Sequence, residues 1–201
     1  NPQNLHVALQ YLGELGCSLK VCRNDELTVE ELKRKNPRGV LISPGPGTSL
    51  PHAQRLQNII ANSFGAWTIV PLLGVCMGMW CICEAFRGKT VRSPYGLKQG
   101  DSCCVYYYDE KDAGLFTGLP NPFQAGRGPD AFLDMDGFPL EALKVTAFTE
   151  DGLIMAARHK IYKYLHGVHF SQESIITSEG KIIVQNFIKL IERKEAAESQ
   201  N

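Results

Sequence analysis

The stretch Val70-Pro-Leu-Leu-Gly-Val-Cys-Met-Gly78 places a cysteine after an apolar run and among small residues. The run from Ile69 to Val75 is typical of a buried strand, and the residues from Met77 to Phe86 are typical of the helix that follows it. Cys76 therefore falls on a tight strand-to-helix turn, where a side chain projects outward and the first N–H groups of the helix favour a thiolate. The sequence predicts that Cys76 is a nucleophile, and a buried, unreactive turn cysteine is the plainer alternative.

The first half of the chain alternates helices and strands around this turn. Such alternation predicts an α/β fold, namely a doubly wound, mostly parallel sheet with helices on both faces. A domain of this kind normally opens with a strand, whereas this chain opens with a helix, so by analogy with the fold we expect the first strand to be missing from the sequence. Besides the elements around Cys76, the patterns predict helices over 5–15, 28–36 and 52–62, and strands over 19–22 and 39–43.

The second half contains more strands, separated by glycine and proline clusters. The patterns predict strands over 102–108, 143–148, 153–157 and 167–170. One apolar stripe from Ile182 to Ile191 marks a final helix, and residues 195–201 form a polar tail that we expect to fray. No repeat or linker interrupts the pattern, so residues 1–201 are expected to form a single domain.

The composition excludes several classes of protein. With 44% apolar and 21% charged residues, the 201-residue chain can bury a core and is not disordered throughout. Its 21 basic and 21 acidic residues balance, so the charge does not point to nucleic acid. The longest apolar run, Trp67 to Cys83, is broken by proline and glycine and is too short to cross a bilayer, and the polar start does not resemble a secretory signal. We expect a soluble protein that binds neither nucleic acid nor membrane.

Seven cysteines raise the question of metal or disulfide chemistry. Their number is odd, no pair has the C-x-x-C spacing, and the five histidines supply no second half of a zinc site. A chain that can bury its own core does not need a disulfide framework. We expect six reduced, buried thiols in a reducing compartment, no metal and no cofactor, with Cys76 as the exception.

A loop rich in proline and glycine, Ser43-Pro-Gly-Pro-Gly47, follows the strand expected over 39–43. The loop lies at the carboxyl edge of the sheet, where α/β domains bind ligands, and its glycines can turn a backbone N–H towards an oxyanion. By itself the loop is equally compatible with a rigid turn. It offers few donors for a phosphate, so a flavodoxin-like nucleotide-binding protein is a weaker alternative.

Three motifs give the chain a resemblance to a known family. The loop Ser43-Pro-Gly-Pro-Gly47, the turn Gly74-Val-Cys-Met-Gly78 and the stretch Gly167-Val-His-Phe-Ser-Gln-Glu-Ser174 resemble the class I, triad-type glutamine amidotransferases. The stretch Thr149-Glu-Asp-Gly-Leu-Ile-Met-Ala-Ala-Arg158 narrows the resemblance to the small subunit of anthranilate synthase, particularly the plant form. The similar amidotransferase subunit of aminodeoxychorismate synthase remains an alternative.

The resemblance implies a thiol mechanism without a cofactor. A cysteine attacks the side-chain amide of glutamine, forms a glutamyl thioester and releases ammonia. The ammonia passes to the large (alpha) subunit of anthranilate synthase, which converts chorismate to anthranilate in tryptophan biosynthesis. The resemblance also implies the chloroplast stroma as the location, although no transit peptide is recognisable, and otherwise the cytoplasm.

Carried onto this chain, the resemblance makes Cys76 the nucleophile and Glu173 the carboxylate that orients the base. The N–H of Met77 and a glycine N–H from the proline-rich loop would form the oxyanion hole. The residues expected around the substrate and its oxyanion are Gly45, Pro46, Gly47, Met77, Trp80, Asp130 and Ala131.

Several residues depart from the family pattern. Ser171 stands where the family has the histidine base, and serine cannot take up the thiol proton at neutral pH. Bulky Trp80 stands where a glutamine helps to hold the substrate, and Gly128-Pro129-Asp130 replaces a Tyr-His-Ser stretch beside it. His169 lies roughly 6.6 Å before Ser171 along a regular strand, too far to act as the base directly. We expect a crippled amidotransferase, and the alternative is a pseudo-amidotransferase that only binds and stabilises the synthase subunit.

Overall fold

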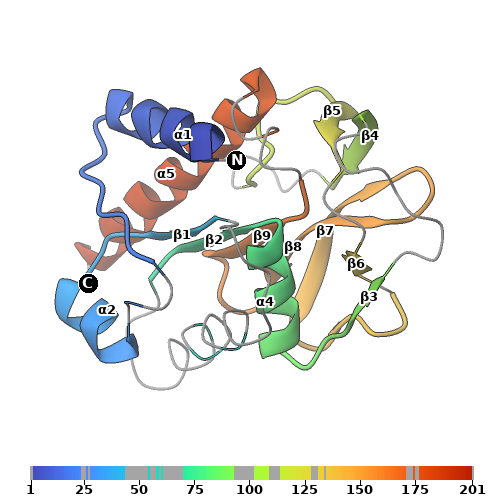
Figure 1. The fold of residues 1–201 in the computed structure, drawn as a ribbon, viewed down its shortest axis with the longest axis horizontal. Coiled ribbons are helices and arrows are strands. Elements are labelled where there is room, and N and C mark those ends of the chain that lie inside the picture. The colour runs from blue at the N-terminus through green and yellow to red at the C-terminus, as the bar shows by residue number, and fades with distance from the viewer. Residues whose placement is uncertain are drawn as a thin grey trace.

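The computed structural model shows an α/β fold in which helices lie on both sides of one large sheet (Figure 1). This architecture confirms the fold class inferred from the sequence. The structure describes residues 2–23, 26, 28–43, 54, 58, 60, 70–92, 102–108, 114–127, 131–133, 135–170, 174 and 177–200.

The central sheet has seven strands in the order β1-β2-β9-β8-β7-β4-β5. Only β1, β2 and β9 run parallel, and every other neighbouring pair is antiparallel. The expectation of a mostly parallel sheet is therefore corrected to a mixed sheet. The strands are β1 (Val40–Ile42), β2 (Leu72–Val75), β4 (Ser102–Tyr107), β5 (Phe123–Gly126), β7 (Leu143–Thr149), β8 (Ile154–His159) and β9 (Leu165–Val168).

Short connections in the second half explain the antiparallel pairing. Between the end of β7 and the start of β8 the chain turns over residues 150–153, where Gly152 takes the left-handed φ of +85°. The N–H of Gly152 donates to the carbonyl of Thr149 at 2.9 Å, which closes the turn. A parallel pair would need a crossover of a dozen or more residues, so this turn can only reverse the chain.

Helices cover the two faces of the sheet. Helix α4 (Met77–Ala85) shares a buried cluster with Leu72 of β2, and α5 (Ser178–Glu198) shares another with Leu73, so alternate residues of β2 face different helices. Helix α1 (Pro2–Glu14) lies beside α5 (Figure 1), where the Lys181 ammonium is 4.9 Å from the centre of the Tyr11 ring. The remaining described helix is α2 (Val29–Lys35).

The capping signals in the first half are confirmed. The side chain of Thr28 accepts the N–H of Glu31 at 3.2 Å, and the Glu31 carboxylate accepts the N–H of Thr28 at 2.8 Å. These two contacts form a capping box at the start of α2. Asn36, with a left-handed φ of +43°, ends α2 before Pro37, and Gly16 follows α1 with φ +82°.

Two expectations for the first half have a different outcome. Residues 19–22 are not a strand, and Leu19 and Val21 are 43% and 59% exposed because no neighbouring strand of the sheet covers them. Of the helix expected over 52–62, only Gln54, Asn58 and Ile60 are described, and all three are helical.

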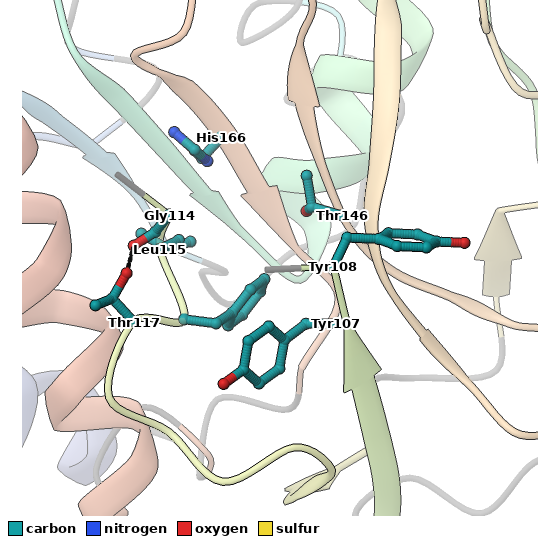
Figure 2. A pocket seen from close by; sticks show the side chains of 8 residues that line it. Tyr107, Tyr108, Gly114, Leu115, Thr117, Thr146 and His166 are labelled. Carbon is teal, nitrogen blue, oxygen red and sulfur yellow. Dashed lines mark hydrogen bonds between the residues drawn. The ribbon is translucent and has the colours of Figure 1, made fainter. Parts of the chain in front are cut away.

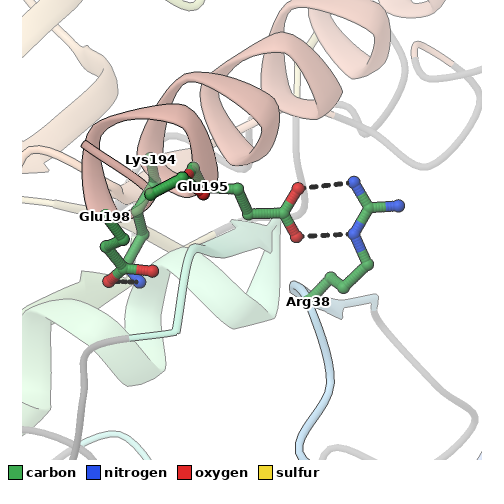
Figure 3. Close-up of polar contacts among 5 residues, drawn as sticks. Arg38, Lys194, Glu195 and Glu198 are labelled. Carbon is green, nitrogen blue, oxygen red and sulfur yellow. Dashed lines mark hydrogen bonds and ion pairs between the residues drawn. The ribbon is translucent and has the colours of Figure 1, made fainter. Parts of the chain in front are cut away.

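The polar end of the chain is more regular than expected. Helix α5 continues to Glu198, so residues 195–198 are helical and not frayed. The Arg38 guanidinium makes two 2.6 Å hydrogen bonds to the Glu195 carboxylate, and the Lys194 ammonium lies 2.5 Å from Glu198 (Figure 3). The bidentate contact ties the end of α5 to the chain just before β1.

Three strands were not expected from the sequence. β3 (Thr90–Arg92) and β6 (Ala131–Leu133) pair antiparallel in a separate two-stranded sheet, and β5 extends the main sheet at one edge. Each is only three or four residues long. So short a run shows too few alternations for a period of two to be recognised.

Candidate functional site

One edge of the sheet gathers the ends of strands from both halves of the chain. In the parallel register Val75 pairs with Val168, and the N–H of Cys76 donates to the carbonyl of Val168 at 2.8 Å. Two successive antiparallel pairings restore the strand direction, so β7 and β5 also end at this edge with Thr149 and Gly126. Carboxyl ends of strands in such sheets are where ligands bind.

Cys76 occupies a strained turn, the elbow, between β2 and α4. Its backbone has φ +54° and ψ −107°, a combination that non-glycine residues rarely adopt. Its carbonyl accepts the N–H of Met79 at 3.0 Å and that of Trp80 at 3.4 Å, which closes the first turn of α4. Strain of this kind costs about 1–3 kcal/mol and clusters at functional sites. The elbow fits the role predicted for Cys76, and the reactivity of the thiol stays a prediction.

Two glycines allow the close packing around the elbow. A Cβ on Gly78 would lie 2.8 Å from the carbonyl oxygen of Ile42 in β1, and a Cβ on Gly74 would lie 2.7 Å from the backbone of Gly78. Both distances are shorter than real Cβ contacts. The helix therefore starts directly against β1 and β2, with its first N–H groups beside the elbow.

The other described thiols differ in exposure, and all seven cysteines are free. Burial raises the pKa of Cys81 and Cys83 on α4 to about 12, so both remain protonated at neutral pH. Cys103 is also buried, but Cys22 is exposed. The expectation of free thiols is confirmed, whereas burial of all six is wrong because Cys22 lies in the irregular segment after α1.

Trp80 and His169 meet beside the elbow. Their ring centres are 5.6 Å apart and the rings are tilted by 53°. His169 is 5% exposed and directly follows Val168, whose carbonyl binds the N–H of Cys76. Trp80 is partly buried, and within the described part of the chain its indole Nε1 is buried without a hydrogen-bond partner. The sequence indicated bulk at Trp80 but not this contact.

A second group of polar contacts lies at the same edge. The side-chain oxygen of Ser174 accepts the N–H of Gly126 at 2.8 Å, and Arg127 pairs with Phe170 in an isolated antiparallel bridge. Both terminal nitrogens of Arg127 lie 3.3 Å from the Asp151 carboxylate. A hydrogen bond from Thr149 and the charge of Arg127 hold the pKa of Asp151 below its usual value. No sequence pattern pointed to these contacts, because the residues are far apart along the chain.

The structure places some of the predicted site residues and not others. It brings Cys76, Met77 and Trp80 together at the start of α4, with Met77 7% exposed. Ala131 lies in β6, opposite Arg92. The predicted residues outside the described part of the chain are Gly45, Pro46, Gly47, Asp130, Ser171 and Glu173, so their roles stay predictions.

The other buried histidines lie away from the elbow. His166 faces a small cavity of about 10 Å³ between β4 and residues 114–117, room for about one water molecule (Figure 2). Its Nε2 lies 2.8 Å from the carbonyl oxygen of Lys163. His159 is held by N–H groups of its own turn, from Ile161 and Tyr162. Both are buried, polar-bonded residues, as the sequence indicated.

Two further searches concern metals and membranes. Among the described residues, no three His, Cys, Asp or Glu side chains gather closely enough to hold a metal ion. Within the same residues no helix combines the length and apolar character needed to cross a bilayer.

Comparison with known proteins identifies the class of this fold and site. A family model, glutamine amidotransferase class-I, matches residues 2–190. The chain belongs to the class-I glutamine amidotransferase family. A GMP synthase subunit of Thermoplasma acidophilum superposes with a TM-score of 0.79 over 97% of this chain and 92% of that one, at 20% identity. At that identity the likeness shows the fold alone.

The nearer relatives are more specific. Anthranilate synthase beta subunit 1 of Arabidopsis thaliana, chloroplastic, is 58% identical over 187 residues, which cover 93% of this chain and 66% of that protein. Anthranilate synthase component 2 of Cyanophora paradoxa is 40% identical over 182 residues, covering 90% of this chain and 91% of its own. The chain thus spans about two thirds of the Arabidopsis protein, and its similarity to anthranilate synthase amidotransferase subunits is confirmed.

Proposed function

We propose that this chain is the amidotransferase subunit of an anthranilate synthase, with residues 1–201 acting as one domain, and that its glutamine-hydrolysing step is strongly impaired. The observation that carries the proposal is the elbow. Cys76 keeps a strained backbone at the shared strand edge and at the start of α4, in a chain 58% identical to a plant beta subunit. Such strain persists where the surrounding structure enforces it, typically at functional sites.

Amide hydrolysis requires a nucleophile and a stabilised oxyanion, both of which this chain can supply. The Cys76 thiolate would attack the side-chain carbonyl carbon of glutamine and form a C–S bond as the carbonyl oxygen becomes an oxyanion. The N–H of Met77, with one from Gly45 or Gly47 around Pro46, would stabilise that oxyanion. Collapse of the intermediate would release ammonia and leave a glutamyl thioester, which water then hydrolyses.

The same reaction requires a base, and this is where the chain is deficient. A base must take up the thiol proton and give a proton to the departing ammonia. Ser171, at the position of the base, does neither at neutral pH, and Glu173 then has no imidazole to orient. Loss of a triad base typically costs on the order of several powers of ten in rate. We therefore infer near-inactivity with glutamine.

Substrate binding is also altered. Trp80 replaces an amide side chain with a large indole close to the elbow, and its ring already contacts His169. Asp130, next to Ala131, brings a carboxylate where the family has a polar stretch beside the substrate. A second negative charge would repel the carboxylate of glutamine. Both changes weaken glutamine binding.

The partner and the location follow from the relatives. The proposed partner is the large (alpha) subunit of anthranilate synthase, which would receive ammonia and act on chorismate. The proposed location is the chloroplast stroma, since the plant relatives are chloroplastic. The related aminodeoxychorismate synthase subunit is the alternative partner, and the product formed by the complex distinguishes the two.

The second candidate function is a pseudo-amidotransferase that binds and stabilises the synthase subunit. The contact between buried His169 and Trp80 favours it, because these rings lie where a working site would need room for substrate. In this case the synthase subunit would use free ammonia.

The experiment that separates the candidates measures anthranilate formation by this chain mixed with an anthranilate synthase large subunit and chorismate. Reactions contain glutamine or an ammonium salt, with Cys76→Ser as the test variant and Cys22→Ser, at an exposed thiol, as the matched control. We expect product with ammonium, little or none with glutamine, and no effect of either variant on the ammonium reaction.

Each other outcome has a defined meaning. Rapid product formation from glutamine that disappears in Cys76→Ser would show a working amidotransferase with another base. Failure of the two chains to associate would refute the proposed function in both forms.

A further inference from the structure

Trp80 is placed to cover the elbow. It lies four residues after Cys76, one helical turn along, and its N–H donates to the carbonyl of Cys76 at 3.4 Å. Side chains on a helix point back towards its N-terminus, so a residue covers the surface of the preceding turn. The indole of Trp80 is therefore directed over the turn that carries Cys76, which is itself only 4% exposed.

His169 lies on the face of β9 that meets α4. A Cβ on Gly167 would lie 3.0 Å from the side chain of Met79 in α4, so residue 167 faces this helix. Side chains two apart on a strand share a face, which puts His169 on the same side. The 5.6 Å separation from the Trp80 ring agrees with this placement.

The two rings thus join α4 to the end of β9 across the elbow. The contact is tilted, the arrangement that aromatic rings prefer over face-to-face stacking. His169 is 5% exposed, so its ring has little room to leave the contact. An indole held on one side by the helix and on the other by this imidazole cannot turn away from Cys76 without breaking the pair.

We infer that His169 is a positioning residue that holds Trp80 as a cover over Cys76, so that the elbow thiol is closed to reagents and substrates of glutamine size. This inference rests on the proposed function only for the meaning of Cys76 as the nucleophile. The cover itself is a property of the isolated chain.

The rate at which iodoacetamide alkylates Cys76 measures the cover directly. The rate is followed for each cysteine separately by mass spectrometry of peptides, with exposed Cys22 and buried Cys81 as references in the same chain. In the unchanged chain we expect Cys76 to react far more slowly than Cys22. Equal rates would overturn the inference without any variant.

Variants of the two rings test how the cover is held. We expect His169→Ala to raise the Cys76 rate about 3- to 10-fold, the equilibrium equivalent of one lost ring contact, and Trp80→Ala to raise it further. Because His169 acts through Trp80, adding His169→Ala to Trp80→Ala should change the rate little more. His169→Phe, which keeps a flat ring, should restore slow alkylation.

His166→Ala is the matched control, because His166 is an equally buried histidine of the same strand that faces the small cavity away from α4. It should leave the Cys76 rate unchanged when far-UV circular dichroism shows a folded chain. An equal increase in His166→Ala and His169→Ala would show general loosening and would refute the positioning role.

A second measurement does not depend on Cys76. The chain has two tryptophans, so Trp67→Phe leaves Trp80 as the only one. In that background we expect acrylamide to quench the fluorescence of Trp80 more strongly after His169→Ala, and His169→Asn provides the same test if the alanine variant does not fold. Unchanged quenching in a folded variant would overturn the inference. None of these measurements requires the synthase subunit, so their failure is distinct from failure of the proposed function.

Discussion

Gly78 and Gly74 determine how closely α4 approaches the strands that carry it. We predict that Gly78→Ala lowers the free energy of unfolding by about 1–3 kcal/mol, the usual cost of overpacking. The reason is that the new Cβ would lie 2.8 Å from the carbonyl oxygen of Ile42, which is backbone and can move only if β1 moves. Urea unfolding followed by circular dichroism measures the change.

Gly13→Ala is the matched control for this substitution. A Cβ on Gly13 would meet nothing within 4 Å, and the residue lies inside α1. The same chemical change should there raise stability by about 0.5–1 kcal/mol, because alanine favours the helix. Equal effects at the two positions would show that the contact with Ile42 does not limit packing.

The missing base leads to a second prediction at this scale. Ser171→His alone should recover little glutamine turnover, because Trp80 still covers the elbow. Ser171→His combined with Trp80→Gln should recover at least about ten times more, since a base and access are both needed. Anthranilate formation from glutamine in complex with the large subunit is the readout. High activity from Ser171→His alone would contradict the obstruction by Trp80.

At the scale of elements, His159 secures the turn between β8 and β9. Its Nδ1 accepts the N–H groups of Ile161 at 3.1 Å and Tyr162 at 3.0 Å. The imidazole lies between the rings of Phe86 and Tyr162, with centres 4.9 and 4.7 Å away. An acceptor for two N–H donors must be unprotonated, and burial lowers the pKa of His159.

This turn should make stability depend on pH. Above the ordinary histidine pKa of about 6.5 both folded and unfolded states are neutral at His159, and its hydrogen bonds contribute in full. As the pH falls through that value towards the lowered folded pKa, only the unfolded state takes up the proton, so stability falls. One such group contributes a slope of at most about 1.4 kcal/mol per pH unit. Urea unfolding between pH 7.5 and 5 should show a steeper loss in the unchanged chain than in His159→Gln, and identical slopes would contradict this role.

How far the elements could be predicted from the sequence depends on their length. Helix α2 was predicted because Thr28 and Glu31 form a local capping box, and α4 because it follows the apolar strand β2. The strand β3 was missed because it is three residues long and gains its partner, β6, from a distant part of the chain. The regular end of α5 was also missed, since its contact with Arg38 joins residues 157 positions apart.

At the scale of the whole molecule, the candidate site depends on pairing that no local pattern reveals. The elbow itself was predictable, because Cys76 and its glycines are neighbours in sequence. The contact of Trp80 with His169 and the ion pair of Arg127 with Asp151 arise only when α4, β9, β5 and the turn after β7 meet at one edge. Mixed pairing in the second half brings those ends together, and a fully parallel sheet would need longer crossovers to do so.

A partner that binds only the folded chain must stabilise it, which gives a prediction for the molecule as a whole. Adding the large subunit of anthranilate synthase should raise the midpoint of thermal unfolding of this chain in a concentration-dependent way, by the equivalent of about 2.7 kcal/mol at one hundred times the dissociation constant. Cys76→Ser should bind equally well, because association does not require the thiol. The shift can be followed by scanning calorimetry, with the aminodeoxychorismate synthase large subunit as the comparison. A larger shift with that protein would reassign the partner, and no shift with either would remove the basis for both the amidotransferase and the pseudo-amidotransferase roles.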